Sequence, residues 1–553
     1  MNLVLLLCSV TLLGSVGYLE SSYWADPTGR WFDGVVNLEQ HKLERKLVES
    51  IKSKKFGIIG AGISGLLTAF LLQSVGIHDW QIMEASTRIG GRIHTIYLNN
   101  TDASEYQYQE AGAMRLPYSV TDSETGQQVV VQDTQMIEQL AHSLNEMNNH
   151  DPSLAIEFIP WVHSKLDISD QLSMAESKGN SMLVDQTVIS HSNIGAVQRA
   201  RQAVAEVKGL NNTKVKEFAN NIFVAHQKSL LAGHFNYSSY SYLVNVLGAD
   251  FNVADLAGQS SNYWPLWESE DVYLLASEWR TIDKGMQRLT DAFKPLVLNR
   301  TKLNFEVGEV QHDKQTGKLN VMPHSVAGNS SDIMQVDYLF NSVPFNLVRF
   351  WDLPPHSSRL RRAINRMIYS GSVKMILHFR TRFWENLKYP ILGGCLSSDN
   401  PMFGELCYPS YNINGSGPGV LLSYVASDDA RALCALSENQ HVNRILAYLK
   451  SLHGPVVYKQ FTGLYHRHCW DHEPYSGGAW SAPSTSQQPL YLPAYFRTEH
   501  NTVYIGEHTS ITHSYIFSAL ESAVRGTVQM LVDVGLTMEA KQIIETWMGR
   551  WMD

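Results

Sequence analysis

The pattern of apolar and polar residues is most regular between Phe56 and Glu84. A short apolar run, Phe56-Gly57-Ile58-Ile59, stops at Gly60, and leucines and alanines then recur at helical spacing from Ile63 to Val75. A second apolar run, Trp80 to Met83, ends at Glu84. This pattern predicts a strand that turns directly into a helix, followed by a second strand.

Further along the chain, residues 132–245 are mostly helix-patterned, as in DTQMIEQLAHSLNEM and AVQRARQAVAEVKG. Ser370 to Glu385 alternates like a half-buried strand. Strands are also predicted over Leu303 to Val310 and Gln335 to Asn341. Tyr504 to Glu507 reads as a last strand, followed by a long helix with apolar i, i+3, i+4 spacing.

The turn between the first strand and its helix carries three glycines, Gly60, Gly62 and Gly65, in the pattern G-x-G-x-x-G. The first permits a tight bend, the second lets backbone approach a pyrophosphate, and the third lets helix and strand pack closely. The helix N-terminus favours a diphosphate, and Glu84 can accept hydrogen bonds from ribose hydroxyls. The motif predicts a dinucleotide site, and the alternative is a glycine-rich turn without a ligand.

Length and composition limit the remaining choices. The chain has 553 residues, of which 44% are apolar and 18% charged, so two or three domains are expected. A formal net charge of −9 gives no support to a nucleic-acid partner. After the first residues, no uninterrupted apolar segment is long enough to predict a membrane span.

The first residues predict export from the cell. Leu3 to Val16 is an apolar block followed by small residues, which is typical of a signal peptide over 1–17, although a buried helix is the alternative. Residues 18–53 form a polar and aromatic leader. A secreted glycoprotein is expected, because N-x-S/T acceptors begin at Asn99, Asn211, Asn236, Asn299, Asn329 and Asn414. The five cysteines allow one or two disulfides, and their pairing is left open.

Two segments after Glu84 carry a family resemblance. Glu84 to Arg92 reads EASTRIGGR, and Glu110 to Pro117 reads EAGAMRLP. They resemble the flavin-containing amine oxidase superfamily, and the RLP version resembles its L-amino-acid oxidase branch. The resemblance implies that Arg88, Gly91 and Arg92 lie along bound FAD, with Met114 and Arg115 also lining the cofactor. The alternative for Arg88 and Arg92 is a surface ion pair.

The resemblance also implies roles at the reacting end of the cofactor. A lysine matching Lys374 holds a water against the flavin, although a lysine in a strand usually faces solvent. Arg115 and Tyr408 would share the substrate carboxylate. The alternatives are a salt-bridged turn residue for Arg115 and a half-buried core tyrosine for Tyr408. Backbone at Val307 would meet the adenine.

The carboxyl-terminal motifs resemble the second half of the same cofactor site. Gly477 and Gly478 would lie near the flavin ring, and Ala479 stands where monoamine oxidases carry the cysteine that attaches FAD. Non-covalent FAD is therefore expected. Glu507 would bind ribityl hydroxyls, and the helix start at Tyr515 and Ile516 would point at the pyrimidine edge of the ring. Tyr515 keeps an aromatic wall where relatives have tryptophan, while Ser514 replaces a glycine and could narrow the site.

The resemblance implies an α/β fold with a discontinuous Rossmann-like FAD-binding domain, an interleaved α+β substrate domain and a helical insert. The FAD-binding parts are 54–104, 285–345 and 486–536, and the substrate-domain parts are 105–131, 246–284 and 346–485. The insert is 132–245, and a tail follows over 537–553.

The expected function is oxidative deamination of L-amino acids by a secreted FAD enzyme, giving 2-oxo acids, ammonia and hydrogen peroxide. Its partners would be an L-amino acid and O2, and a homo-oligomer is left open. No side chain is assigned as an obligatory base. The alternatives are a monoamine or polyamine oxidase, whose substrates lack a carboxylate, and a non-catalytic secreted flavoprotein.

Overall fold

The computed structural model describes residues 29–38, 44–122, 124–162, 191–208, 212–257, 264–269, 273–324, 333–398 and 402–552. The predicted signal peptide lies outside these ranges, as do the acceptors Asn211 and Asn329. The predicted leader is described in part, as helices α2 (Gly29–Val36) and α3 (Arg45–Lys52).

A parallel sheet holds the predicted strand-helix-strand unit. Strand β1 (Phe56–Ile59) lies at its centre, and β2 (Trp80–Met83) pairs with it in register from Phe56↔Trp80 to Ile59↔Met83. Both strands are therefore confirmed with their predicted bounds. In the described part of the chain this sheet has the order β21-β13-β1-β2-β9, which adds β9 (Thr301–Lys302), β13 (Tyr338–Asn341) and β21 (Thr502–Tyr504).

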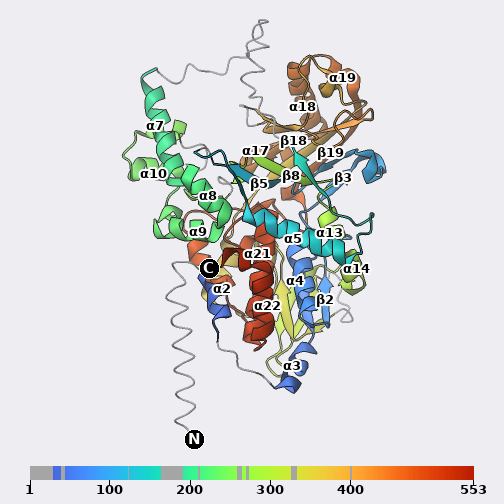
Figure 1. The fold of residues 1–553 in the computed structure, drawn as a ribbon, viewed down its shortest axis with the longest axis vertical. Helices are drawn as coiled ribbons and strands as arrows, with labels where there is room; N and C mark the ends of the chain where they lie inside the picture. Colours follow the sequence, from blue (N-terminus) through green and yellow to red (C-terminus); the bar gives the residue numbers. More distant parts are fainter. Residues whose placement is uncertain are drawn as a thin grey trace.

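Helices cover this sheet and connect its distant strands (Figure 1). Helix α4 (Ile63–Ser74) ends one residue before the predicted end and packs against α21 (Ile516–Asp533). Helix α21 also packs against α5 (Gln132–Met147) and α22 (Thr537–Trp547). The predicted tail thus contains a packed helix, with Ile543, Ile544 and Trp547 buried in the main core. These layers give the expected α/β fold with a Rossmann-like sheet.

A second, antiparallel sheet forms the other half of the molecule. Among the described residues its order is β16-β17-β18-β15-β19, comprising β16 (Gly394–Ser397), β17 (Glu405–Tyr408), β18 (Gly419–Ala426), β15 (Ser372–Phe379) and β19 (Phe461–Cys469). Helices α17 (Ser427–Cys434) and α18 (Glu438–His453) lie beside it. Disulfides join Cys395 to Cys407 and Cys434 to Cys469, which resolves the pairing that the sequence left open.

The predicted helical insert contains a strand. Helices α7 (His191–Lys208), α8 (Asn212–Asn220), α9 (Ile222–Leu231) and α10 (Ser239–Asn245) agree with the pattern. Strand β7 (Phe158–Trp161) does not, because it pairs with β8 (Glu278–Ile282). In the described chain this sheet has the order β6-β5-β8-β7, with β6 (Gln128–Val130) and β5 (Leu116–Thr121). Because β7 is at the edge, it tolerates Pro160, which cannot donate to a ladder.

A small antiparallel sheet continues from the parallel one, with β10 (Val307–His312), β11 (Leu319–Pro323) and β12 (Met334–Val336). Searching the described helices for a stretch apolar enough and long enough to traverse a bilayer finds none.

Candidate functional site

A cavity of about 850 Å³ lies against both the parallel sheet and the second, antiparallel sheet. Its volume is in the range of small-molecule and cofactor sites. Most of the predicted site residues line it: Gly60, Gly62, Glu84, Arg88, Gly91, Arg92, Met114, Arg115, Val307, Lys374, Glu507, Tyr515 and Ile516. The cavity thus brings together residues that are up to 456 positions apart, from Gly60 to Ile516. Gly65 and Tyr408 are described but are not among its lining residues.

The glycine loop has the geometry expected of a phosphate cradle. Gly60 has φ +95°, a conformation that favours glycine, and Gly62 precedes α4 with open space where a side chain would stand. A Cβ on Gly65 would lie 2.0 Å from the Gly60 carbonyl oxygen, so Gly65 serves the close packing of helix on strand. A Cβ on Gly91 would meet the Gly62 Cα at 3.1 Å. Gly91 also has a positive φ of +56°, and this close approach of two backbone segments suits a bound diphosphate.

Glu84 and Arg88 hold the backbone around this loop by hydrogen bonds. The Glu84 carboxylate accepts hydrogen bonds from the backbone N–H of Ala61 at 2.6 Å and of Ser86 at 2.8 Å. The Arg88 guanidinium donates to the Gly91 carbonyl at 2.6 Å and to the carbonyls of Ile89 and Ile93. Arg88 is thus held by backbone groups and not by the surface ion pair that was its alternative. Both residues keep atoms on the cavity wall.

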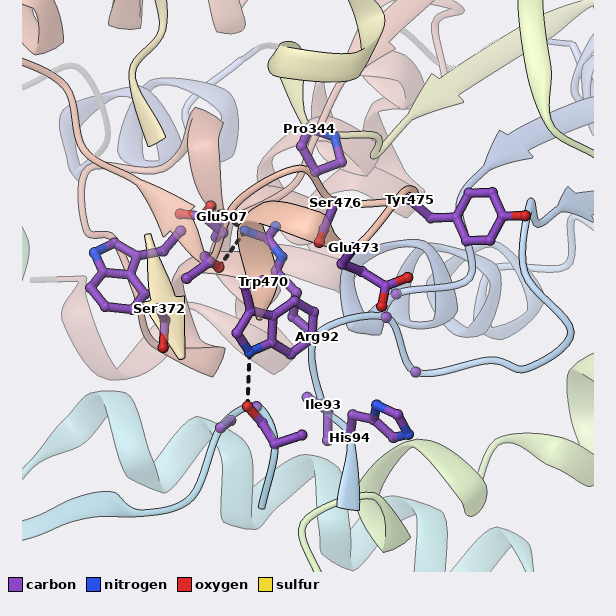
Figure 2. A pocket seen from close by; sticks show the side chains of 18 of the residues that line it. Arg92, Ile93, His94, Pro344, Ser372, Trp470, Glu473, Tyr475, Ser476 and Glu507 are labelled. Atoms are coloured by element: carbon purple, nitrogen blue, oxygen red, sulfur yellow. Dashed lines mark hydrogen bonds and ion pairs between the residues drawn. The ribbon is translucent and has the colours of Figure 1, made fainter. Parts of the chain in front are cut away.

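Arg92 and Glu507 form an ion pair at the cavity wall, with 2.7 Å between Nη1 and Oε1 (Figure 2). Arg92 also donates to the Ala479 carbonyl, and Glu507 accepts from the backbone N–H and the hydroxyl of Ser481. Burial acts to raise the pKa of Glu507, but Arg92, His513 and His508 together lower it to about 2. Glu507 is therefore a carboxylate at neutral pH, and the ion pair joins two segments that are 415 residues apart.

A row of polar side chains crosses the second sheet and faces the cavity. Lys374 of β15 lies opposite Tyr424 of β18, and Tyr424 lies opposite Glu405 of β17. Directly paired residues share one face of a sheet, and all three line the cavity. The Lys374 Nζ lies 5.1 Å from the Tyr424 ring centroid. The strand register therefore places these three side chains at one wall of the cavity.

Lys374 is 4% exposed, so the solvent-facing alternative for this residue is wrong. Its ammonium donates to the Gly112 carbonyl at 2.5 Å. Burial lowers the pKa of Lys374, and interaction with Glu110 acts in the opposite direction. Burial likewise raises the pKa of Glu110, whose carboxyl group accepts from Thr95 and from the backbone of Met286. Desolvation thus brings the buried amine toward its neutral form.

Arg115 lies at the same wall, beside Glu405. Its Nη2 is 3.3 Å from each Glu405 carboxylate oxygen, and its guanidinium carbon is 5.0 Å from the Trp279 ring centroid. Nη1 lies 3.7 Å from Cys395 Sγ. Burial acts to lower the pKa of Arg115, but Glu405 and Tyr515 raise it overall. A permanently charged guanidinium therefore lines the cavity.

Tyr408 has a different place from the one the sequence predicts. It is fully buried, and its hydroxyl contacts His453 Nε2 at 2.5 Å within the core between β17 and α18. Successive side chains in a strand point to opposite faces, so Tyr408 lies on the face opposite Glu405. The core-tyrosine alternative describes it correctly. Of the two strand tyrosines Tyr408 and Tyr424, it is Tyr424 that lines the cavity, and only the pairing of β18 with β15 could have identified it.

The start of α21 closes another part of the wall. Tyr515 is the residue before the helix, and its ring lies 4.4 Å from the ring of Tyr273. Ser514 has φ +66°, and its hydroxyl has no hydrogen-bond partner among the described residues. Ser514, Tyr515 and Ile516 all line the cavity. The strained serine conformation agrees with a position where relatives of the resembled family have glycine.

Trp470 and His94 also line the cavity and were missed by the sequence reading. The Trp470 indole N–H donates to the Ala111 carbonyl at 2.8 Å, and Figure 2 shows His94 next to Ile93 among the lining residues. At another part of the wall Val307 lines the cavity with Phe305 and Glu306. No role was predicted for either residue, and only the folded arrangement places their side chains in the cavity.

Comparison with known proteins gives the family. The model of the flavin containing amine oxidoreductase family matches residues 63–531. An L-amino-acid oxidase of Neurospora crassa is 38% identical over 556 aligned positions, covering 96% of this chain and 79% of the relative. An L-amino-acid oxidase of Siganus canaliculatus is 28% identical, covering 86% of this chain and 84% of the relative.

Solved structures agree on the fold. A putrescine oxidase bound to putrescine superposes with a TM-score of 0.58 at 16% identity, covering 87% of this chain and 99% of that structure. A cyclohexylamine oxidase of Brevibacterium oxydans gives 0.59 at 14% identity, covering 88% of this chain and 100% of that structure. The match of the family model over most of the chain, together with the relative at 38% identity, shows that this protein belongs to the flavin containing amine oxidoreductase family.

Proposed function

We propose that this protein is a secreted oxidase that deaminates L-amino acids with non-covalently bound FAD. The observation that carries the proposal is a partly buried guanidinium, Arg115, which lines the same cavity as the glycine loop and Lys374. A guanidinium recognises a carboxylate through a planar fork of donors. The similarity to proteins named L-amino-acid oxidase supports the same substrate class.

The dinucleotide segment of FAD would lie along Gly60, Gly62 and Gly91, which line the cavity and have no side chain to obstruct it. A bound flavin supplies the two-electron oxidation of the amine to an imine, with O2 taking the electrons as hydrogen peroxide and water releasing ammonia. Ala479 offers no thiol for attachment. Each cysteine in the described ranges is in a disulfide, which supports a non-covalent cofactor.

The remaining residues bind and orient the substrate. Arg115 would hold the α-carboxylate. Tyr424 would take the role that the family resemblance implied for Tyr408, because Tyr424 lines the cavity beside Lys374. Lys374 would hold a water through its buried amine. The substrate must present a neutral amine, and no side chain is assigned as an obligatory base. These contacts would orient the Cα–H bond and exclude bulk water.

Export is supported by the apolar block at residues 3–16 and by glycosylation acceptors. Four of the acceptors fall in the described ranges, and all four are exposed: Asn99, Asn236, Asn299 and Asn414. Exposure is what attachment of a glycan requires.

An amine oxidase is the second candidate, because Glu405 already partners Arg115 and reduces the need for a substrate carboxylate. A peroxide-coupled assay with the common L-amino acids, their D-enantiomers and a set of primary amines and polyamines separates the two. Peroxide from L-amino acids is expected. Peroxide only from amines lacking a carboxylate would refute the proposal, and a flavin that no substrate reduces anaerobically would indicate a non-catalytic flavoprotein.

A further inference from the structure

We infer that Glu405 determines substrate specificity by charge, favouring L-amino acids with a cationic side chain and disfavouring those with an acidic one. The inference rests on the proposed function, since it assumes that Arg115 holds the α-carboxylate. Glu405 lines the cavity and is adjacent to Arg115. A second charge beside the clamp must affect every ligand that carries a charge of its own.

The ion pair leaves capacity on Glu405 for another donor. Both carboxylate oxygens lie 3.3 Å from the same nitrogen, Nη2 of Arg115, which is long for a charge-assisted hydrogen bond. A carboxylate has about four lone-pair positions, and this contact uses few of them. The Glu405 side chain is 26% exposed, against 12% for Arg115, so it is the more accessible partner.

The surrounding strands hold Glu405 in this position. It pairs with Ser397 of β16 on one side and with Tyr424 of β18 on the other, and the Cys395–Cys407 disulfide joins β16 to β17 two residues away. The Tyr424 ring separates Glu405 from Lys374, whose burial favours its neutral form. Glu405 therefore faces the cavity from a rigid sheet, with Arg115 as its contacting cation.

The charges beside Arg115 determine which substrate side chains are favoured. Once a substrate α-carboxylate binds Arg115, the groups in direct contact there are one cation, Arg115, and two carboxylates, that of Glu405 and that of the substrate. A cationic side-chain group restores the balance, a neutral side chain leaves it unchanged, and an acidic side chain adds a third carboxylate. Interactions between charges a few ångströms apart in a partly buried site are large enough to change affinity about tenfold to a hundredfold.

The test uses ligands that lack the α-amine and so report binding without the proposed oxidation. Hexanoate, 6-aminohexanoate and adipate all have six carbons and differ in the charge of the far end. Each is titrated anaerobically into the flavin-loaded enzyme, and Kd is taken from the change in the flavin absorbance. For the wild type, 6-aminohexanoate should bind most tightly and adipate least.

Glu405→Gln should lower the ratio of the adipate Kd to the 6-aminohexanoate Kd by about tenfold or more, because the amide keeps the shape and loses the charge. Glu405→Asp should keep the wild-type order. Glu473→Gln is the matched control, because Glu473 also lines the cavity but lies beside His468 and Arg88. It should leave the ratio unchanged.

Three results would overturn the inference. The first is an equal change in all three Kd values for Glu405→Gln, because mispositioning of Arg115 alone predicts that result. The others are the same shift in the Kd ratio for Glu473→Gln, and no absorbance change of the wild-type flavin with any of the three ligands. Turnover of L-norleucine, L-lysine and L-2-aminoadipate is measured in parallel. If none is oxidised while the binding order still follows Glu405, the proposed function fails and the charge selection stands.

Discussion

Replacing Arg115 by alanine should lower kcat/KM for neutral L-amino acids by about two to three orders of magnitude. A charge-assisted contact to the substrate carboxylate contributes roughly 1.5 to 3 kcal/mol. In this variant Glu405 also loses the guanidinium nitrogen that lies 3.3 Å from its carboxylate, and its unpaired charge faces the incoming substrate carboxylate. For a partly exposed charge this repulsion adds about 1 kcal/mol. The total of roughly 2.5 to 4 kcal/mol corresponds to about two to three orders of magnitude, at about 1.4 kcal/mol per tenfold.

The flavin content of Arg115→Ala should stay near the wild-type value, because the contacts of this side chain go to Glu405, Cys395 and Trp279 and not to the glycine loop. Activity is measured by peroxide release and flavin by its visible absorbance. Arg115→Lys should recover only part of the activity, since an ammonium lacks the planar fork. Arg115→Ala combined with Glu405→Gln should recover about fivefold over Arg115→Ala, because the repulsion is gone.

A flavin-replete Arg115→Ala enzyme with full activity on L-amino acids would refute the carboxylate clamp. Loss of flavin or misfolding of the variant would instead indicate that Arg115 is a structural residue of its turn.

Four other predictions follow from the same geometry. Acid or heat precipitation should release the yellow cofactor into the supernatant, and colour that stays with the pellet would contradict non-covalent binding. The mature secreted protein should begin after the signal peptide, residues 1–17, and should shift in mobility on glycosidase treatment. A protein that starts at Met1 and does not shift would rule out export. Tyr424→Phe should lower kcat/KM about three- to tenfold through the loss of one neutral hydrogen bond, whereas Tyr408→Phe should change thermal stability but not kcat/KM. A loss of kcat/KM for Tyr408→Phe alone would indicate that Tyr408, and not Tyr424, contacts the substrate. The Glu507 pKa is lowered from 4.5 to about 2, so its ionised form stabilises the folded protein above pH 4.5, and that stabilisation is lost as pH falls toward 2. Between these two pH values the melting temperature of the wild type should therefore fall more steeply than that of Glu507→Gln. Parallel curves for the two proteins would contradict the ion-pair assignment.

The sequence alone located what depends on local chain geometry. The β1–α4–β2 unit was predicted within one residue because its pattern, its glycines and Glu84 lie within 29 consecutive residues. Strand β7 was missed because four residues containing a proline carry no clear alternation, and only its pairing with β8 makes them a strand.

The cavity wall on the second sheet depends on register, which a single sequence does not reveal. A tyrosine was expected to help bind the substrate carboxylate, but Tyr408 and Tyr424 could not be told apart without the pairing of β17, β18 and β15. Glu405 is separated from Arg115 by 290 residues, and no motif marks it. Its electrostatic effect on the site arises only from tertiary structure.

The order of strands in the parallel sheet also affects how the protein is made. The sheet begins with β1 at residue 56, but its edge strand β21 ends at Tyr504, and Glu507 and α21 follow still later. A ribosome must therefore reach α21, which contributes Ile516 and Ala519, before the cavity has all its walls. Until then the glycine loop exists without its partner segments, and the early sheet strands cannot bury their apolar faces against α21. Cofactor capture is thus a late event in biogenesis, and a chain truncated before residue 502 would retain the recognisable dinucleotide motif without a site to hold the flavin.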